Sequence, residues 1–551
     1  MKVFDTVQVK KPAKNVFNLS HDVKASYNFD KLYPFLCKPV YPGDTFNCRA
    51  EVFLRAMPLV TPVMHNVDMH IYFFFVPMRL VWNADKKHDW KIFITGGEDG
   101  MQTAELPYFT YNDALDVLPE AVGNKGIMDY MGFPTVNENV VDTATFNNGN
   151  VRVCSLPFRA YQLVYNEYFR NQNVQNEVEF GYGQGHEDSA DLQLLLTFRK
   201  KCWEKDYFTS CLPWAQRGQA ITLPIEGSAL VPSGQLNVKI TDARVPTTSS
   251  VSHTLNVPAN GTTVNVSGIT ASTSSRAVQL EGIASGGTMT FTGLTIGTIN
   301  DFRYCLRLQQ WLEANARCGS RYIEQIFSHF GVKSSDARLQ RPELLGGGKI
   351  PLIFSDVPQT SYGDGLTGAT NVVGDLAGKG TLYGKTSGFK KFFEEHGILL
   401  GICTIIPRTS YSQGVPREWT AFDKTDWYFP EFAHLGEQAV LNKEVYYDPI
   451  NAQSLSTPND GVFGYQGRFT ELRYYNGSFH GDLRNTLQAW HLGRIFSRQP
   501  QLNDTFVKAS TRANIFALDD VQIGIYDPFV CQMHLDIKAV RPLPKYAIPT
   551  L

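Results

Sequence analysis

The sequence predicts an all-β protein, either a sandwich or a jelly roll, with long insertions between strands and few helices. Alternation of apolar and polar residues recurs along the chain and is typical of half-buried strands. The connections are long and rich in glycine and proline, with 45 Gly and 29 Pro among 551 residues. The few helical patterns do not alternate regularly with strands, which argues against a parallel α/β sheet.

Three segments carry the clearest strand patterns. Between 45 and 54 apolar residues alternate with polar ones, so this strand should bury one face and expose the face of Asn47 and Arg49. The segment 67–76 begins with alternation and ends in "IYFFFV", as expected where a strand is covered on both faces. Alternation at 533–537 predicts a last strand followed by a proline-rich tail.

Apolar residues at helical spacing predict helices near 158–172, 301–330 and 482–496. In the third segment, Leu483, Leu487 and Trp490 would face inward. Core packing explains all three apolar stripes without any further role.

Charge is distributed unevenly, although the net charge is only −2. Both ends of the chain are basic, and their cations are Lys2, Lys10, Lys11, Lys14 and Lys24 at the N-terminus and Lys538, Arg541 and Lys545 at the C-terminus. A balanced total can therefore hide a surface that attracts phosphates.

Cysteine usage and apolar runs bear on the compartment. The nine cysteines include no C-x-x-C pair, so neither a disulfide framework nor a zinc site is indicated. The N-terminus lacks the apolar run of a signal peptide, and the most apolar stretches are too short for a spanning helix. We expect a soluble protein that is made and kept in a cytoplasm, with no membrane insertion.

The segment 225–300 differs in composition from the rest of the chain. Its stretch 254–298 has a single aromatic residue, Phe291, whereas 13% of all residues are aromatic. Asn260-Gly261 between alternating apolar residues is a strong hairpin signal. We therefore predict β-hairpins that project from the main body or pack against copies of themselves.

Patterns that could carry chemistry are weak. "GDGLTG" at 363–368 lacks the strand and helix of a dinucleotide site, and "GDLAGKG" at 374–380 is one residue short of a phosphate loop. We interpret both as glycine-rich loops. Histidines show no ligand spacing, so no catalytic, cofactor-binding or metal-binding residues are predicted. A carbohydrate-binding or hydrolytic β-protein with the insertion as a lid remains an alternative hypothesis.

Several runs, in order along nearly the whole chain, resemble the major capsid protein of the Microviridae, and specifically its gokushovirus-like branch. They are "YPGDTF" (41–46), "PLVTPVMHNVDMHIYFFFVPMRLVW" (58–82), "ITGG" (94–97), "LPFRAYQLVYNEYFRNQ" (156–172), "GSRYIEQIFSHFGVKSSDARLQRPELLGGG" (319–348), "FFEEHG" (392–397), "YFPEFAHLGEQ" (428–438), "FGYQGRF" (463–469), "WHLGRIF" (490–496) and "IKAVRPLPKY" (537–546).

The resemblance implies an eight-stranded viral jelly roll, an antiparallel β-sandwich, whose copies close into a T=1 icosahedral shell around a circular single-stranded DNA genome. It implies an insertion that projects at the three-fold axes and meets the host. The implied partners are further copies of the chain, the DNA, an internal scaffolding protein, a DNA pilot protein and a receptor on the bacterial surface. The protein would be a virion component assembled in the host bacterial cytoplasm, with no enzymatic activity and no cofactor.

The expected domains are a basic interior arm (1–40), two parts of the jelly-roll core (41–224 and 301–536), the surface insertion (225–300) and a basic proline-rich tail (537–551). The candidate DNA contacts are Lys2, Lys10, Lys11, Lys14, Lys538, Arg541 and Lys545. The candidate host-attachment residues are Asn260, Gly261, Arg276 and Phe291.

Overall fold

The computed structural model describes residues 13–83, 89–97, 101–135, 151–218, 226–232, 235–242, 252–256, 276–280, 286–295, 299–318, 327–328, 330, 335–360, 376–449, 459–517 and 526–546. Contacts divide the chain into two compact units, one formed by Met1–Ala215 with Arg317–Leu551 and the other by Gln216–Ala316.

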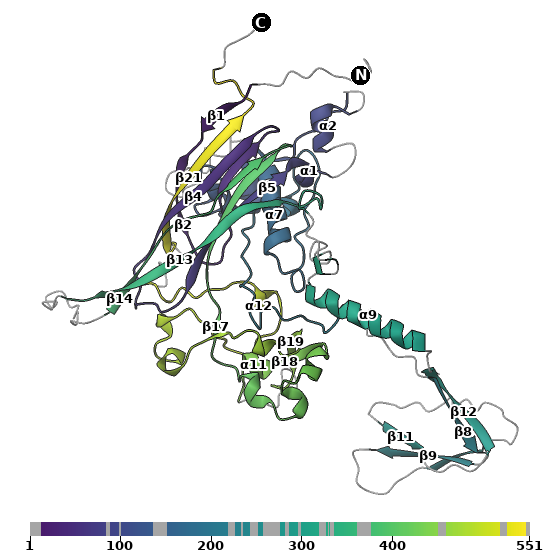
Figure 1. The fold of residues 1–551 in the computed structure, drawn as a ribbon. Helices are drawn as coiled ribbons and strands as arrows, with labels where there is room; N and C mark the ends of the chain where they lie inside the picture. Colours follow the sequence, from purple (N-terminus) through teal and green to yellow (C-terminus); the bar gives the residue numbers. More distant parts are fainter. Residues whose placement is uncertain are drawn as a thin grey trace. The chain divides into compact units, whose positions relative to one another are not determined.

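The larger unit is built on one ten-stranded sheet, in which eight strands follow the order β1-β21-β4-β14-β13-β5-β16-β3, while β15 pairs with β4 and β2 with β21. All pairings in it are antiparallel (Figure 1). The strands are β1 (Asn15–Asn18), β2 (His21–Tyr27), β3 (Tyr33–Val40), β4 (Thr45–Ala56), β5 (Val67–Pro77), β13 (Glu343–Pro358), β14 (Leu376–Lys385), β15 (Phe389–Phe392), β16 (Gly397–Pro407) and β21 (Phe529–Arg541).

The long strand β13 pairs with two different strands of the curled sheet. Its residues 343–352 pair with β5 and its residues 353–358 pair with β14, so it links the two halves of the sheet. The main core lies inside the curl and takes alternate residues of β4 and β21, from Phe46 to Leu54 and from Phe529 to Ala539. This is the all-β jelly-roll core that the sequence predicts, and the alternation expected at 45–54 and 533–537 is confirmed.

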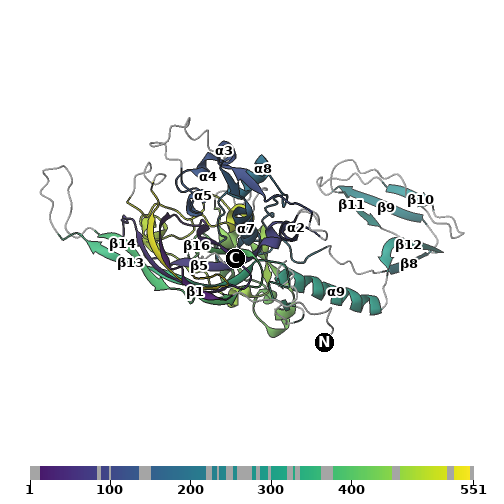
Figure 2. The same ribbon diagram turned by 90° about the horizontal axis from the view of Figure 1, so that it is seen from above.

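A helical layer covers the other side of β5 and β16. Phe74, Val76 and Leu400 pack there into a second core with α7 and α8, and Figure 2 shows α3, α4, α5 and α8 gathered together. The prediction that 67–76 is covered on both faces is confirmed. The layer contains α1 (Met78–Val81), α2 (Trp90–Thr95), β6 (Tyr108–Thr110), α3 (Tyr111–Val117), α4 (Pro119–Val122), α5 (Ile127–Tyr130), β7 (Arg152–Cys154), α7 (Leu156–Val164), the π-helix η1 (Tyr165–Phe169) and α8 (Ser189–Leu196).

A smaller cluster is built mainly from the chain after β16. Its apolar centre includes Tyr207, Tyr411, Phe463 and Phe506. Its elements are β17 (Ser410–Tyr411), η2 (Arg417–Thr420), η3 (Lys424–Asp426), η4 (Pro430–His434), β18 (Glu437–Leu441), α11 (Asn442–Val445), β19 (Val462–Gly467), η5 (Thr470–Leu472), β20 (Gly477–Ser478), η6 (Gly481–Arg484), η7 (Gln488–Trp490) and α12 (Asp504–Val507).

The smaller unit contains two small antiparallel sheets, β10-β9-β11 and β12-β8. Its elements are β8 (Glu226–Pro232), β9 (Gln235–Asp242), β10 (Ser252–Asn256), β11 (Arg276–Leu280), β12 (Gly286–Thr295) and most of the helix α9 (Ile299–Cys318). The unit therefore extends beyond the expected insertion 225–300 and includes the first half of the helix predicted near 301–330.

Both expected ends of the chain differ from the structure. Within 1–40, three strands (β1, β2 and β3) belong to the main sheet, so only a shorter segment could act as an arm. Residues 537–541, placed in the tail by the sequence, are the last residues of β21. The reason is edge pairing, since β1 and β2 satisfy the backbone groups of β21 on the side away from β4.

The helix predicted near 158–172 is confirmed as α7 with η1. The prediction of a helix near 482–496 is wrong, because that segment forms two short 3-10 turns, η6 and η7. The buried His491 ring explains the break. Its Nδ1 accepts from the Gly493 N–H at 2.9 Å, so its Nε2 donates to the Leu483 carbonyl at 2.8 Å. A helix would need that carbonyl for Leu487, whose N–H instead donates to Asp482.

The prediction that the glycine-rich run 374–380 is a loop is wrong from Leu376 onward, because these residues form β14. A Cβ on Gly378 would lie 2.7 Å from the Thr61 carbonyl oxygen, and one on Gly380 would lie 2.8 Å from the Ala56 Cβ. At both positions the lack of a side chain lets the neighbouring segments pack closely against β14. The run 363–368 lies outside the described residues.

Candidate nucleic-acid interface

The predicted cations that the structure describes lie near one end of the main sheet. β1 pairs with β21 so that Asn15 is opposite Arg541 and Asn18 is opposite Lys538. This pairing brings the two basic ends of the chain together, with Lys14 directly before β1 and Lys545 shortly after β21. Lys2, Lys10 and Lys11 lie outside the described residues.

Arg541 is used inside the fold. Its Nε lies 3.3 Å from Oδ2 of Asp44, whose side chain is 1% exposed. Its Nη2 donates to the Pro39 carbonyl, and the guanidinium lies 5.8 Å from the ring centre of Tyr41 and 5.2 Å from that of Phe46. Because a buried carboxylate requires a compensating cation, this arginine is not free to bind a phosphate.

Lys14 and Lys545 are exposed but make local contacts. The Lys14 ammonium donates to the Gly43 carbonyl at 3.0 Å and lies 4.9 Å from the ring centre of Phe392. The Lys545 ammonium lies 5.8 Å from the ring centre of Tyr546. Such exposed contacts are weak, so both lysines can exchange them for a phosphate.

Lys538 points away from the core on an exposed row of polar residues. It is opposite Asn18 in β1 and Asn47 in β4, and Asn47 is in turn opposite Lys390 in β15. We call the exposed side of β2, β21, β4, β14 and β15 the basic sheet face. Its cations without a hydrogen bond or ion pair to another described side chain are Lys24, Arg49, Arg55, Lys379, Lys390 and Lys538.

The acidic groups on the basic sheet face have partners of their own. Asp22 pairs with His534, Glu51 with Lys385, and Asp536 with the Ser20 hydroxyl. The hydrogen bond from Lys385 to Glu51 raises the pKa of that lysine. Asp536 meets only a neutral hydroxyl, and His534 neutralises Asp22 only when it is protonated. The cations without partners outnumber these two carboxylates, so the net charge of this face is positive.

Aromatic side chains stand among these cations. Phe53 is 39% exposed and is opposite Tyr383, which is 69% exposed. The Arg55 guanidinium lies 5.2 Å from the ring centre of Phe53. Cations that neutralise phosphates, together with aromatic or guanidinium planes on which bases stack, are what non-specific binding of single-stranded nucleic acid requires.

Most of this face was missed by the sequence-based candidates. The alternation at 45–54 placed Arg49 on the polar side of a strand, but nothing in one sequence says which other strands lie beside it. The register shows that Lys390 and Lys538 flank Asn47 although they are far apart in the chain.

The host-attachment candidates are only partly within the described residues. Arg276 begins β11 opposite Asp242 in β9, and Phe291 lies in β12. Asn260 and Gly261 fall outside them. The structure therefore places two of these residues in separate small sheets of the smaller unit.

Among the described residues, no group of three or more His, Cys, Asp or Glu side chains could hold a metal ion. Among the same residues, no helix is long and apolar enough to cross a membrane.

The curled antiparallel sheet and its basic face define a structural jelly-roll protein with a surface suited to nucleic acid. Comparison with known families makes this specific, because the family described as "Capsid protein (F protein)" matches residues 5–551. The chain belongs to that capsid protein family, which confirms the resemblance to the gokushovirus-like major capsid proteins of the Microviridae. It is a structural protein and a virion component rather than an enzyme, and the hydrolase alternative falls away.

Individual relatives match this chain over nearly their whole length. The chain is 34% identical to capsid protein VP1 of Bdellovibrio phage phiMH2K, over 97% of this chain and 95% of that protein. It is 32% identical to capsid protein VP1 of Chlamydia phage 1, over 100% of this chain and 97% of that protein. It is 28% identical to capsid protein VP1 of Spiroplasma virus 4, over 98% and 95% of the two chains.

Proposed function

We propose that this chain self-assembles into a T=1 icosahedral shell that encloses a circular single-stranded DNA genome, and that its insertion attaches the particle to the host. The observation that carries the DNA part is the basic sheet face, with its unpaired cations and exposed aromatic rings. Assembly takes place in the host bacterial cytoplasm, with an internal scaffolding protein and a DNA pilot protein as further partners.

Exposed aromatic residues support the self-assembly part. Within the segment 417–435, Trp419 is 75% exposed, Phe422 88% and Trp427 60%. Monomeric proteins rarely expose so many large apolar side chains together, and obligate interfaces bury about 2,000 Å² or more. We place this segment in a contact between subunits.

The assembly proposal is tested by expressing the protein and imaging the soluble fraction by negative-stain electron microscopy. Uniform isometric particles are expected, and Trp419→Ser with Phe422→Ser should abolish them without lowering the melting temperature. Tyr475→Ser is the matched control because Tyr475 is 73% exposed outside this segment. Small oligomers only, even with the scaffolding protein co-expressed, would contradict the shell.

The DNA proposal is tested by neutralising Lys379, Lys390 and Lys538 to glutamine together. The particles should contain less DNA. In a plot of the logarithm of the oligodeoxynucleotide binding constant against the logarithm of salt concentration, the slope should become less steep by about 0.7 per phosphate contact removed. The control neutralises the three exposed lysines Lys91, Lys200 and Lys205, which are neither on this face nor in the segment 417–435. Equal DNA content in both variants would show that the face does not line the genome.

The attachment proposal is tested by deleting 232–297. Particles should still form, because the main sheet and both larger cores lie in the other unit, while adsorption to host cells should be lost. Loss of particles from a folded subunit would instead make the insertion an assembly element. Normal adsorption would remove the receptor from the proposal.

A further inference from the structure

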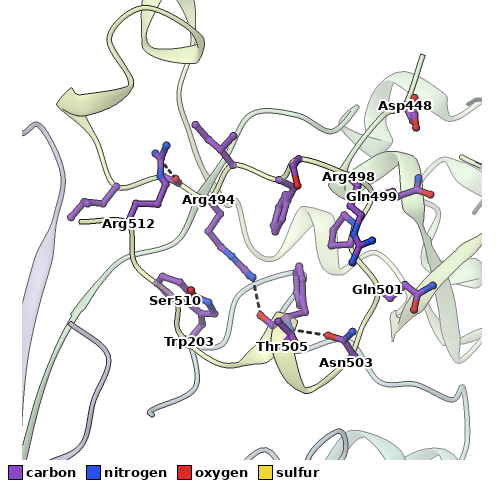
Figure 3. Close-up of a pocket in the computed structure, with 17 residues that line it drawn as sticks. Trp203, Asp448, Arg494, Arg498, Gln499, Gln501, Asn503, Thr505, Ser510 and Arg512 are labelled. Carbon is purple, nitrogen blue, oxygen red and sulfur yellow. Dashed lines mark hydrogen bonds between the residues drawn. The ribbon is translucent and has the colours of Figure 1, made fainter. Parts of the chain in front are cut away.

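Two cavities of the larger unit differ in the chemistry of their walls. The first, of about 1100 Å³, lies in the smaller cluster, and Arg494, Arg498 and Arg512 are among the residues that line it (Figure 3). The second, of about 460 Å³, lies at the main sheet and has mostly apolar walls. It is lined by residues of the segments 19–21 and 38–41 and of β4, β16 and β21, and we call it the seam pocket.

The seam pocket lies between the two edges of the curled sheet. One edge is β3, and the other is formed by β1 and β2, which both pair with β21. At one end these edges are joined, because the Asn28 N–H donates to the Tyr33 hydroxyl at 2.9 Å and the ring centres of Tyr27 and Tyr33 lie 4.9 Å apart. At the other end the pocket lies between residues 19–21 and residues 38–41, so the seam is open there.

The floor of the seam pocket is part of the main core. It is formed by Phe46, Leu399 and Ile537, which are all buried and come from three different strands. The walls include Leu19 and Tyr41, which are 38% and 48% exposed. Water in such a cavity finds few hydrogen-bond partners, so an apolar ligand that displaces it is favoured.

Backbone groups beside the seam pocket leave little for an added peptide strand. Pro39 has no N–H, and its carbonyl accepts from Arg541 Nη2 at 3.3 Å. The Leu19 N–H donates to the Ile537 carbonyl at 2.8 Å, and the Leu19 carbonyl accepts from His21 Nδ1 at 2.8 Å. A peptide that extends a sheet is held by main-chain hydrogen bonds, and proline at a sheet edge opposes such pairing. The pocket therefore suits a ligand whose buried part needs no hydrogen bonds.

Two polar groups of the lining can receive a negative charge. Lys38 is exposed, and its ammonium makes no hydrogen bond or ion pair with a described residue. The Tyr41 hydroxyl likewise has no hydrogen-bond partner among the described residues. None of the described residues that line the pocket is acidic. An ammonium and a phenol hydroxyl together complement a carboxylate, which accepts hydrogen bonds from both.

We propose that the seam pocket binds one free fatty acid, whose acyl chain lies on Phe46, Leu399 and Ile537 and whose carboxylate meets Lys38 and Tyr41. A volume of about 460 Å³ is in the lower part of the usual range for small-ligand sites, about 300–1,000 Å³. It therefore holds a single unbranched chain rather than a lipid with two chains. Because the ligand contacts both edges of the sheet, it links them and stabilises the folded subunit.

The test titrates the unassembled full-length protein with octanoate, decanoate and dodecanoate by isothermal titration calorimetry, below their critical micelle concentrations. The affinity should rise about fourfold for each added methylene, which is the gain expected from burying it. Dodecylammonium has the same chain and the opposite charge, so it should bind more weakly than dodecanoate. An affinity that is independent of chain length, or equal for dodecanoate and dodecylammonium, would overturn the proposal.

Variants locate the site. Leu19→Trp, at an exposed position, fills the pocket and should lower the affinity for dodecanoate about tenfold, because each displaced methylene costs about fourfold. Lys38→Gln should lower it about two- to fivefold, whereas Lys91→Gln, at an exposed lysine outside the pocket, should leave it unchanged. Dodecanoate should raise the melting temperature of the wild type but not of Leu19→Trp. Wild-type affinity in Leu19→Trp would place the ligand elsewhere, and the proposal would fail.

Two further measurements distinguish a fatty acid from a protein segment as the occupant. Residues 1–12 precede β1 and lie outside the described residues. A chain without residues 2–12 should bind dodecanoate with unchanged affinity, and a gain of about tenfold would make that segment the occupant and overturn the proposal. Particles purified from cells should release a fatty acid on organic extraction, measured by mass spectrometry. Particles without fatty acid, formed by subunits that bind dodecanoate, would make a neighbouring subunit the occupant and would also overturn it.

Discussion

The two halves of the main sheet differ in what covers them. In β16 every residue is buried, because the jelly-roll core lies on one side and the helical layer on the other. In β4 the buried residues alternate with exposed or partly exposed ones, because nothing in the described structure covers its second face. The half with a free face can carry cations and exposed rings, whereas the half that is covered twice is restricted to apolar packing. Doubly buried apolar packing and exposed cations thus lie in different halves of one sheet.

The largest contrast is expected between two phenylalanines in these halves. Phe74 in β5 is 1% exposed and its ring centre lies 4.9 Å from that of Tyr168, so Phe74→Ala should cost ~3–5 kcal/mol of unfolding free energy. Phe53→Ala on the basic sheet face should cost about 0.5 kcal/mol or less. Urea denaturation of unassembled subunits measures both. Equal losses would mean that the two halves do not differ as described.

A second contrast lies within the half of the sheet that has a free face, between two cations of β21 on opposite faces. Arg541→Gln leaves the buried Asp44 carboxylate without its cation and should cost about 3 kcal/mol. Lys538→Gln removes the same charge from the exposed face and should lower DNA binding while the melting temperature stays at the wild-type value. If Arg541→Gln instead lowered only DNA binding, Arg541 would belong to the basic sheet face.

The smallest expected effect concerns acid stability in the covered half. Burial, with the nearby charges of Lys201 and Lys349, lowers the pKa of His70 in β5 to about 2. The unfolded chain takes up this proton near pH 6.5 and the folded chain does not, so stability should fall by about 1.4 kcal/mol per pH unit below 6.5. His70→Gln should flatten this part of the profile, measured as unfolding free energy at pH 7.5 and 5.0. An unchanged slope would mean that His70 is protonated in the folded protein.

Local pattern predicted those parts of the fold whose environment is encoded in their own residues. The strand at 45–54 has apolar residues at every second position, which predicted one buried face. The strand at 67–76 has them at nearly every position, which predicted two buried faces. The pattern failed at 482–496, where apolar residues have helical spacing but the imidazole of His491 takes a carbonyl that a helix would need. That competing hydrogen bond comes from beyond the first two turns, and spacing alone does not reveal it.

The candidate site divides in the same way. Clusters of lysine and arginine at both ends of the chain are visible in the sequence, and pairing of β1 with β21 does bring Lys14 and Lys538 to one end of the sheet. The inward direction of Arg541 and the position of Lys390 beside Asn47 depend on register, which is fixed by pairing between segments that are distant in the chain.

The sequence by itself determined that the chain has a β-rich core, basic ends, an aromatic-poor insertion and no recognisable catalytic motif, because composition and periodicity are properties of consecutive residues. The structural role came from the resemblance of its ordered runs to a capsid family. Only the tertiary structure decided which cations share a face and which one neutralises a buried carboxylate. These are distances between residues far apart in the chain. They are set by the packing of the sheet, the helical layer and the smaller cluster.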